Sequence, residues 1–564
     1  MLNDPDNYQR LVQVRDWMGG QSWWDTKQHR IDPPTGLQMH WSRLGDLPLG
    51  LLIHFFSLFA EHTKAEMLAV VSLPPLLLFV TIIFLCRTAR NIGSVPAERF
   101  LQLFVIATSF FLAQFIPGRI DHHGLQLLLL SAALAAATAM PTKRSGLLTS
   151  LSVAIALLIG LETAPLLLAI PAWMALNWLW KGEAQKAQLQ GFLIGILFFL
   201  PFLYMISVAP SDWNRLTNDQ VGIGHLAIIA MAAASLALIL QFKLRSLEHR
   251  LAGLAIFAIA TALPVLAFRE VLAAPYSAID PLLQQLWIGS IAETQSAWPI
   301  ADTNPLRLLR YHLFPALALL AATGVYLATG REPKLLLILM VGLAGFALSI
   351  WQIRAMAAAS MVALLLCSIT IAHLWQKRSE PLGTARLFAS MLILNGHFGF
   401  MIYHMVAPDD RQGMSMVAET TLTNRCETQL RGEDYNQVRP GLVLNGISSG
   451  ALILARTHHS VLAAANHRGI EGNGKAYRIL LAPSSEAHVA LARNGVDYVL
   501  TCRDSELERL AQYAPDSLAA DLVRQHIPEW LLPISHEGGE AVLFFAISPD
   551  KPLSETPKTG QHSM

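Results

Sequence analysis

Long apolar runs recur from Glu66 to residue 405, and they limit the possible folds of this chain more than any other feature. A helix needs about 20 apolar residues to cross the roughly 30 Å hydrocarbon layer of a bilayer. The chain is 53% hydrophobic and only 14% charged, so such runs dominate it. The pattern predicts a mainly α polytopic membrane protein. We expect about twelve spanning helices, at 66–86, 99–116, 124–140, 146–160, 163–180, 191–209, 224–241, 250–268, 313–329, 334–351, 354–375 and 385–405.

Lysine and arginine occur in every second short loop, from Arg87 to Arg386. Positive charge in short loops marks the cytoplasmic side of a membrane, so the remaining connections are predicted to face outward. These are the N-terminal segment, the residues near Asp121, the loop 269–312, the turn before Arg354 and everything after 405. The pattern predicts a multi-pass protein of the inner (cell) membrane with a periplasmic or otherwise extracytoplasmic C-terminal part. The net charge of +1 gives no basic excess that would favour nucleic acid as a partner.

Two domains are predicted. Residues 1–405 form the transmembrane domain, with a first outer loop at 1–65 and a long outer loop at 269–312, and residues 406–564 form a small extracytoplasmic α/β domain. In the second domain the pattern predicts strands at 477–481, 496–500 and 541–545 and helices at 484–494 and 505–526. Cys426 and Cys502 are either a disulfide or two free thiols.

A run of polar residues, Gly118-Arg119-Ile120-Asp121-His122-His123-Gly124, joins two apolar runs on the predicted outer side. Asp121 and His123 are two residues apart, so both can reach one metal ion if the backbone is extended or turned. The alternative is that Asp121 caps a helix and the imidazoles lie at the membrane interface. Ionisable groups beside a spanning helix cost desolvation if they are unused, which favours the metal site.

Four further residues are predicted on the same side: Asp4, Asp6, Glu293 and Arg354. Acidic residues and histidine confined to one membrane face suit a divalent metal that holds a phosphate or pyrophosphate leaving group. Each residue has a simpler interpretation. Asp4 and Asp6 could be ordinary N-terminal loop residues or cap a helix at 8–19. Glu293 could be a solvated loop carboxylate, and Arg354 could extend from a helix end to the interface.

The order Asp6-Asn7-Tyr8 after Asp4, then Asp121-x-His123, then Ser290-Ile291-Ala292-Glu293 resembles the catalytic subunit of oligosaccharyltransferase of the bacterial and archaeal single-subunit type. The resemblance implies a glycosyltransferase C-type fold. It implies transfer of a saccharide from a polyprenyl (pyro)phosphate donor, with help from Mg or Mn. The implied roles are metal ligation by Asp6, Asp121 and His123, with Asp4 and His122 as possible participants, catalysis by Asp6 and Glu293, and donor-phosphate binding by Arg354.

Two features depart from that family. Its members place the first acidic motif after a first spanning helix, which this sequence lacks, so we expect a further helix upstream in the functional protein. The Trp-Trp-Asp-Tyr-Gly motif, with which the family reads the Asn-x-Ser/Thr sequon, is absent, and residues 441–450 contain no tryptophan. The acceptor therefore stays open between protein, lipid and polysaccharide.

A transporter or flippase of lipid-linked saccharides is the rival hypothesis, and an inactive assembly subunit is a third. A transporter should carry ionisable groups near the middle of its helices, whereas the predicted helix interiors are nearly free of charge. The expected partners are a polyprenyl-linked saccharide, an acceptor and membrane lipids. We also expect part of the segment 282–298 to pack as a short helix over the Asp121 turn.

Overall fold

The computed structural model describes residues 2, 4–273, 276, 279–303, 305–406, 426, 428–430, 435–534 and 542–548. The chain divides into two compact units, each described by itself. The helical unit comprises Met1–Thr26, Met39–Ala278 and Ile291–Asp409, and the sheet unit comprises Lys27–Gln38, Ile279–Ser290 and Asp410–Met564. Compared with a single boundary after residue 405, the sheet unit also includes a short N-terminal segment and the middle of the loop 269–312.

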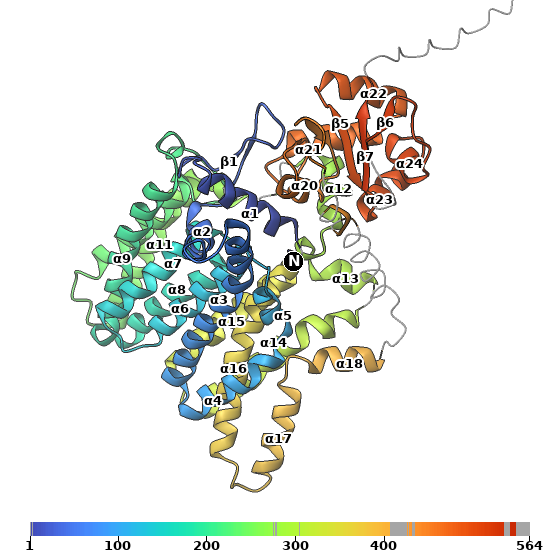
Figure 1. The fold of residues 1–564 in the computed structure, drawn as a ribbon. Coiled ribbons are helices and arrows are strands. Elements are labelled where there is room, and N and C mark those ends of the chain that lie inside the picture. Colours follow the sequence, from blue (N-terminus) through green and yellow to red (C-terminus); the bar gives the residue numbers. More distant parts are fainter. Residues whose placement is uncertain are drawn as a thin grey trace, which may run out of the picture. The chain divides into compact units, whose positions relative to one another are not determined.

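The helical unit is built from helices of very different lengths (Figure 1). Its described helices are α1 (Pro5–Met18), α2 (Arg43–Ser57), α3 (His62–Ile92), α4 (Val95–Phe104), α5 (Ser109–Leu112), α6 (His123–Ala137), α7 (Lys143–Ile159), α8 (Ala164–Lys181), α9 (Glu183–Ser207), α10 (Ile223–Ile239), α11 (Leu247–Ala267), α13 (Ala297–Thr303), α14 (Arg307–Ala328), α15 (Pro333–Trp351), α16 (Met356–Gln376), α17 (Gly383–Ile393) and α18 (Phe398–Val406). Short 3₁₀ turns connect several of them, including Ala292–Thr294 and Ile353–Ala355.

The predicted class, a mainly α polytopic membrane protein, is confirmed, but the predicted count of about twelve spans is not. Among the described residues, six helices are long and apolar enough to cross a membrane, or up to eight if two bent pairs each count as one span. The predicted spans 99–116 and 385–405 are these bent pairs, with bends of 75° and 71°. Helix α6 has 15 residues, and at 1.5 Å per residue it is shorter than the hydrocarbon layer. Apolar composition alone does not reveal such breaks and short helices.

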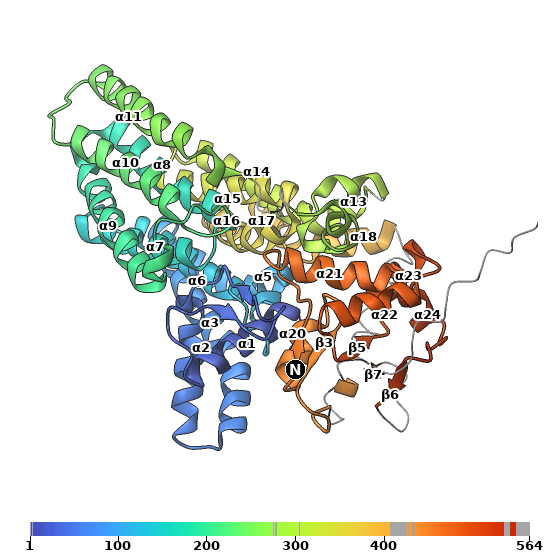
Figure 2. The same cartoon turned by 90° about the horizontal axis from the view of Figure 1, so that it is seen from above.

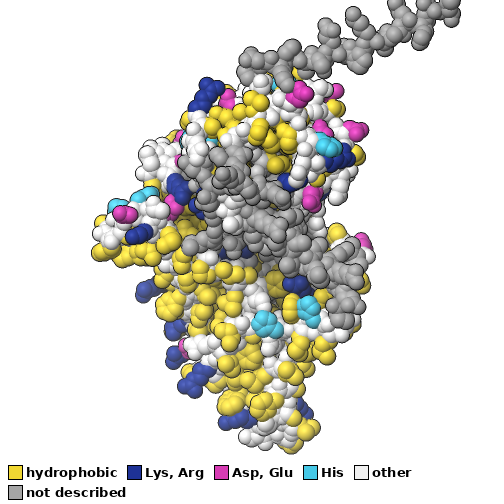
Figure 3. Space-filling view, turned by 45° about the vertical axis from the view of Figure 1, so that its right-hand side comes forward, with side chains coloured by type: hydrophobic (Ala, Val, Ile, Leu, Met, Phe, Trp, Pro, Cys, Tyr) yellow, Lys and Arg dark blue, Asp and Glu magenta, His cyan; other side chains and the backbone are white. Residues whose placement is uncertain are grey.

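Helix α16 runs through the middle of the helical unit (Figure 1), and every residue from Met356 to Ala372 is buried. It packs against α4, α14, α15 and α17. Outer helices instead expose apolar side chains, such as Leu263 and Leu266 on α11, and hydrophobic side chains cover much of the lower face in Figure 3. Such an apolar surface is what a helix facing lipid presents. The turn Ile353–Ala355, which precedes α16, is therefore held next to the most buried element of the unit.

Helices α7 and α9 approach each other closely through glycines. A Cβ on Gly146 would collide with the backbone around Gln188, and one on Gly191 would collide with the backbone of Lys143. Small residues let helix backbones pack at short range in membranes, where the hydrophobic effect does not drive helices together. A capping box between Thr142 and Ser145 fixes the start of α7. This packing and the capping box hold the N-terminal part of α7 against α9.

The sheet unit contains a two-stranded hairpin and a five-stranded sheet. Its described elements are β1 (Lys27–Gln28), β2 (Leu37–Gln38), α12 (Pro281–Leu286), β3 (Leu442–Leu444), α20 (Gly450–Arg456), β4 (Ser460–Val461), α21 (Ile470–Leu481), α22 (Ser484–Arg493), β5 (Tyr498–Cys502), α23 (Ser505–Tyr513), α24 (Leu518–Val523), β6 (Leu531–Pro533) and β7 (Val542–Ile547). The strand order is β4-β3-β5-β7-β6, with the first three strands parallel and the last two antiparallel to their neighbours. Helices α21 and α22 lie side by side (Figure 2).

The predicted α/β character of this region is confirmed, with two corrections. Residues 477–481, predicted as a strand, form the end of α21, because a short buried apolar run looks the same in a helix and in a strand. The predicted helix 505–526 is two helices, α23 and α24, with Pro515 between them. Cys426 and Cys502 form a disulfide, which decides between the two alternatives left by the sequence.

The loop 269–312 is shared between the two units. A short helix, α12, overlaps the start of the segment 282–298, and it packs against α21 in the sheet unit. Arg509 Nε donates a hydrogen bond to the carbonyl of Leu286 (2.9 Å) and holds the end of α12 there. The later part of the loop, which carries Glu293, belongs to the helical unit. Packing of the short helix over the Asp121 turn stays a prediction.

Candidate active site

The start of α1 and the Asp121 turn are joined by one buried side chain. Asn7 Oδ1 accepts hydrogen bonds from the backbone N–H groups of Ile120 (2.7 Å) and Asp121 (2.9 Å). Asp4 caps α1, accepting from the backbone N–H of Asp6 (2.9 Å). Asn7 thus brings the two acidic motifs together, although they lie far apart in the sequence. The sequence contained Asn7 within the first motif, but gave no signal for this role.

Asp121 uses both of its carboxylate oxygens inside the protein. Oδ1 accepts from the backbone N–H of His123 (2.9 Å), the first residue of α6, although the N-cap residue of this helix is His122. Oδ2 lies 3.0 Å from Nε of Arg119 in a largely buried ion pair. One oxygen therefore satisfies an N–H at the start of α6, but Asp121 is not the capping residue that the alternative interpretation described. A carboxylate oxygen has two lone pairs, so these contacts leave room for a further ligand.

Four carboxylates of the helical unit interact with one another: Asp4, Asp6, Asp121 and Glu293. Burial raises the pKa of Asp4 to about 6, and the charges of Glu293 and Asp121 add to the rise. Burial likewise raises the pKa of Asp6 well above its usual range, with Asp4 and Glu293 contributing. For Asp121, burial acts in the same direction, but the fields of His123 and Arg119 outweigh it and lower the pKa. The cluster therefore concentrates negative charge that a bound cation would stabilise.

A cavity in the helical unit brings together further predicted residues. Its charged and imidazole lining residues are Arg119, His123, Glu162, Glu293 and Arg354, and Gln114, Gln126 and Gln352 also line it. Arg354 Nη2 donates to the hydroxyl of Tyr276 (2.9 Å). The backbone N–H of Ile353 donates to the carbonyl of Gln295 (3.0 Å), which ties the Arg354 turn to the loop that carries Glu293. The structure thus brings Glu293 and Arg354 to one cavity.

Glu162 is the charged residue of this cavity to which the sequence assigned no role. It stands in the short turn between α7 and α8. His122 Nε2 lies 3.1 Å from Oε1, and the amide of Gln126 donates to Oε2 (2.6 Å). Burial alone would raise the pKa of Glu162, but His122 and Gln126 more than offset it and hold the pKa well below its usual range. The only signal in the sequence was a carboxylate in the short Pro-containing break between the predicted spans 146–160 and 163–180.

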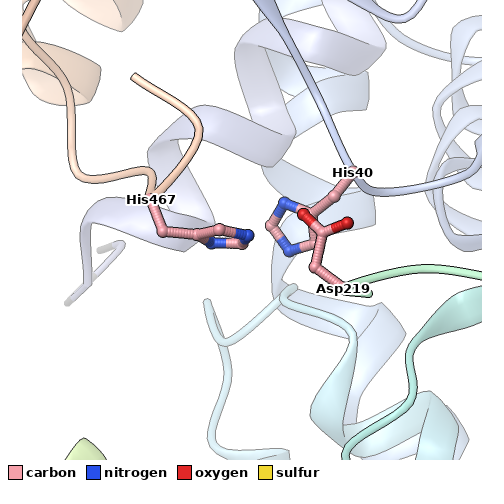
Figure 4. Close-up of side chains that lie close together, drawn as sticks. All are labelled: His40, Asp219 and His467. Carbon is pink, nitrogen blue, oxygen red and sulfur yellow. The ribbon is translucent and has the colours of Figure 1, made fainter. Parts of the chain in front are cut away.

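The predicted metal ligands are not arranged as a compact preformed site. Within the described part of the chain, Asp6, Asp121 and His123 do not form a group whose ligand atoms all lie within 4.8 Å of one another. His40 and Asp219 of the helical unit do lie within that distance, and their side chains point toward each other (Figure 4). His467, also labelled there, belongs to the sheet unit. The shared ion at Asp6, Asp121 and His123 stays a prediction.

No protein-family model and no curated protein matches this chain. Solved structures do. The oligosaccharyltransferase AglB from Archaeoglobus fulgidus, in complex with an inhibitory peptide and a dolichol-phosphate, superposes with a TM-score of 0.66 at 15% identity, covering 98% of this chain and 71% of that chain. The apo form of the Archaeoglobus fulgidus oligosaccharyltransferase gives 0.64 at 15% identity, with the same coverage. The chain has an oligosaccharyltransferase fold.

A third structure of the same archaeal enzyme, in complex with Zn and sulfate, has a TM-score of 0.58 at 14% identity, covering 98% of this chain and 70% of that chain. The likeness extends over nearly the whole chain, so the predicted glycosyltransferase C-type architecture, with its small α/β domain, is confirmed. Identity this low establishes the oligosaccharyltransferase fold alone. Function has to be argued from the cavity and the carboxylates.

Proposed function

We propose that this chain is a membrane glycosyltransferase that moves a saccharide from a polyprenyl (pyro)phosphate donor to an acceptor on the outer face of the membrane. The observation that carries the proposal is the cavity of the helical unit, where Arg119 and Arg354 stand beside Glu293 in an oligosaccharyltransferase fold. Guanidinium groups suit a phosphate, and a carboxylate suits the proton of an attacking group.

Arg354 binds the donor phosphate. Its Nη2 is engaged by Tyr276, whereas its buried Nε has no hydrogen-bond partner among the described residues. A buried N–H without a partner is costly, so a phosphate oxygen would satisfy it. Arg119, which also lines the cavity, adds positive charge for the same group.

Asp6, Asp121 and His123 hold a divalent metal, Mg or Mn, with Asp4 and His122 as possible further participants. The fit rests on the donor set, since carboxylate oxygens suit these cations and an imidazole is tolerated by Mn. Asn7 supports the arrangement by tying the Asp121 turn to the start of α1. Such an ion, when bound, neutralises charge that develops on the leaving phosphate.

Asp6 or Glu293 accepts the proton of the attacking group. Glu293 lines the cavity together with Arg354, so a group attacking the sugar beside a bound phosphate lies within its reach. Burial and the neighbouring carboxylates raise the pKa of Asp6, which makes its carboxylate a stronger base and Asp6 the second candidate. These two carboxylates are the catalytic residues of the proposal.

The archaeal enzyme of this fold has been seen with a dolichol-phosphate and an inhibitory peptide, and with Zn and sulfate. By analogy, the partners proposed here are a polyprenyl-linked saccharide, membrane lipids and an acceptor that is a protein, a lipid or a polysaccharide. Residues 1–405 are the catalytic domain. The domain 406–564 lies in the periplasm or another extracytoplasmic space, where the disulfide between Cys426 and Cys502 is stable.

The rival hypothesis, a transporter or flippase, gains no support from the comparisons. Asp121, Glu162 and Glu293 stand in turns between the long helices, not in the middle of spanning segments. Ionisable groups that carry cargo across a membrane are expected near the bilayer centre.

Mass spectrometry of glycolipids and glycoproteins in a deletion strain tests the proposal. We expect one saccharide-modified product to disappear and its lipid-linked precursor to accumulate. Wild-type protein should restore the product, and an Asp121→Asn variant of equal membrane abundance should not. A normal product profile in the deletion strain, or full rescue by Asp121→Asn, would contradict the proposed function.

A further inference from the structure

Glu162 has no part in the reaction described above, yet it is built into the same cavity. The cavity carries two guanidinium groups, Arg119 and Arg354, and two carboxylates, Glu162 and Glu293. Glu293 is the proton acceptor of the proposed reaction. A second carboxylate would repel the phosphate of the donor, so its presence needs a reason other than phosphate binding.

The backbone around Glu162 is shaped to admit its carboxylate. Helix α7 ends at Ile159, and the next residue is Gly160. A Cβ on Gly160 would collide with Oε2 of Glu162 and would also meet the amide nitrogen of Gln126. Only glycine leaves this space open, so the turn is matched to the position of the acid.

The side chains that hold Glu162 are buried and packed against neighbouring rings or helices. His122 is 4% exposed, and its ring lies in tilted contact with those of Trp41 and His123, at centroid distances of 5.7 Å and 4.3 Å. Gln126 is 1% exposed. The side chain of Glu162 is itself 26% exposed. Buried supports that present a partly open carboxylate to a cavity are typical of a pre-organised binding group.

The chemistry of the carboxylate selects the ligand. An ionised carboxylate accepts about four hydrogen bonds and donates none, and within the described residues two donors reach Glu162, namely His122 and Gln126. Glu162 also belongs to no described group of three candidate metal ligands. What fits is a ligand with neighbouring hydroxyl donors, and the saccharide of the donor has them.

We propose that Glu162, held by His122 and Gln126, accepts hydrogen bonds from hydroxyl groups of the saccharide on the lipid donor. The inference rests on the proposed function and adds to it a residue that distinguishes saccharide-bearing lipid from bare polyprenyl phosphate. Arg354 binds the phosphate of both lipids, whereas Glu162 contacts only the first.

The test measures which lipids the full-length protein retains. Wild-type and variant proteins are purified in mild detergent from their own membranes, and mass spectrometry quantifies the retained saccharide-bearing polyprenyl lipids and bare polyprenyl phosphate. Glu162→Gln keeps the size of the side chain and removes its charge. Glu183→Gln on α9 is the matched control, because Glu183 is exposed, pairs with Lys186 and does not line the cavity. Gly160→Ala displaces the carboxylate without removing it.

We expect Glu162→Gln to lower the ratio of saccharide-bearing to bare lipid roughly 10- to 100-fold, as the loss of charge-assisted hydrogen bonds does. Gly160→Ala should lower it in the same direction, and Glu183→Gln should match the wild type. An unchanged ratio in Glu162→Gln overturns the inference and leaves the proposed function intact. Equal loss of both lipids, with an unchanged melting temperature, also overturns it. Absence of any polyprenyl lipid from the wild type contradicts the proposed function itself.

Discussion

Glu162 in the helical unit and Glu506 in the sheet unit are both glutamates held by hydrogen bonds inside the protein, but they are satisfied in different ways. Glu506 is 4% exposed and accepts from the backbone N–H groups of Ile447 (2.7 Å) and Ser448 (2.9 Å) and from the hydroxyl of Tyr477 (2.8 Å). Glu162 accepts from two side chains and lines a cavity. The first carboxylate fixes a loop, and the second still has acceptor capacity to offer a ligand.

The loop fixed by Glu506 follows β3, at the position in the sequence where the sequon-reading motif was sought. Both backbone N–H groups at Ile447 and Ser448 donate to one internal carboxylate. A carboxylate with its oxygens engaged in this way stabilises a conformation. The comparison therefore indicates that burial of an acid does not by itself mark a site. What marks it is the combination of rigid support, free lone pairs and a cavity.

The largest effect is expected at Asp121, whose carboxylate both forms hydrogen bonds and an ion pair inside the protein and is proposed to bind the metal. Asp121→Asn keeps an oxygen that can accept from the backbone N–H of His123, and therefore keeps this hydrogen bond at the start of α6. It removes the charge that the proposed metal requires. We expect saccharide transfer per folded molecule to fall roughly 10²- to 10³-fold or more. Loss of the ion pair with Arg119 should also lower the melting temperature, so transfer is measured well below that temperature and normalised to folded protein. Transfer within threefold of wild type would remove Asp121 from the site.

Glu293→Gln should have the next largest effect, because it removes the proposed proton acceptor and keeps the shape of the cavity wall. General-base removal typically costs roughly 10²-fold or more in rate. Donor affinity should stay within about twofold, since Arg354 makes the phosphate contact. Separate measurements of donor binding and single-turnover transfer check this. Equal losses in both would make Glu293 a donor ligand, and no loss in either would make it a solvated loop residue.

The site residues predicted from the sequence are ionisable groups, and most of them stand beside apolar runs. Asp121, Glu293 and Arg354 are conspicuous for that reason, and the order of their motifs carries the resemblance to oligosaccharyltransferase. The fold class could also be predicted from the sequence, because apolar runs of about twenty residues fit few structures other than membrane-spanning helices. The number of spans was not, because bends and short helices depend on packing with neighbours.

Asn7, Gln126 and Glu162 could not be recognised from the sequence, because what they do depends on partners far along the chain. Asn7 contacts residues more than one hundred positions away, and Gln126 contacts Glu162 across the chain reversal formed by α6 and α7. An asparagine or glutamine in the sequence carries no local pattern that predicts such a long-range contact. The end of α21 was mistaken for a strand for a related reason, since only its neighbours decide between the two structures.

The distinction between Glu506 and Glu162 can be tested directly by replacing each glutamate with glutamine and measuring the free energy of unfolding. In Glu506→Gln, the amide nitrogen replaces one carboxylate oxygen and would face the backbone N–H of either Ile447 or Ser448. Both groups are donors and the backbone cannot reorient, so neither is satisfied, at a cost of roughly 1–3 kcal/mol. In Glu162→Gln, His122 can change tautomer and accept from the amide, so the cost should stay below about 1 kcal/mol. Hydrogen exchange of segments 442–456 and 498–513 reports the first effect. Equal destabilisation by both variants would contradict the distinction between the two carboxylates.

The smallest effect concerns Asp504, the acidic neighbour of Glu506. Burial, with a contribution from the charge of Glu506, raises the pKa of Asp504 to about 7. The folded state therefore binds the proton more tightly than the unfolded state, whose aspartate has a pKa near ~3.9. The stabilisation from this proton is complete below pH ~4 and is lost progressively as the pH rises through about 7.

Asp504→Asn should remove this pH dependence. An asparagine oxygen can still accept from the backbone N–H of Leu507, so the cap of α23 is kept, and the side chain no longer ionises. The wild-type sheet unit should exchange faster at pH 8 than at pH 5 once intrinsic exchange rates are divided out. The slope within this window can reach about 1.4 kcal/mol per pH unit, and in the variant it should flatten. If the variant kept the wild-type slope, another group would be responsible, and Asp504 would already be ionised in the folded state at pH 5.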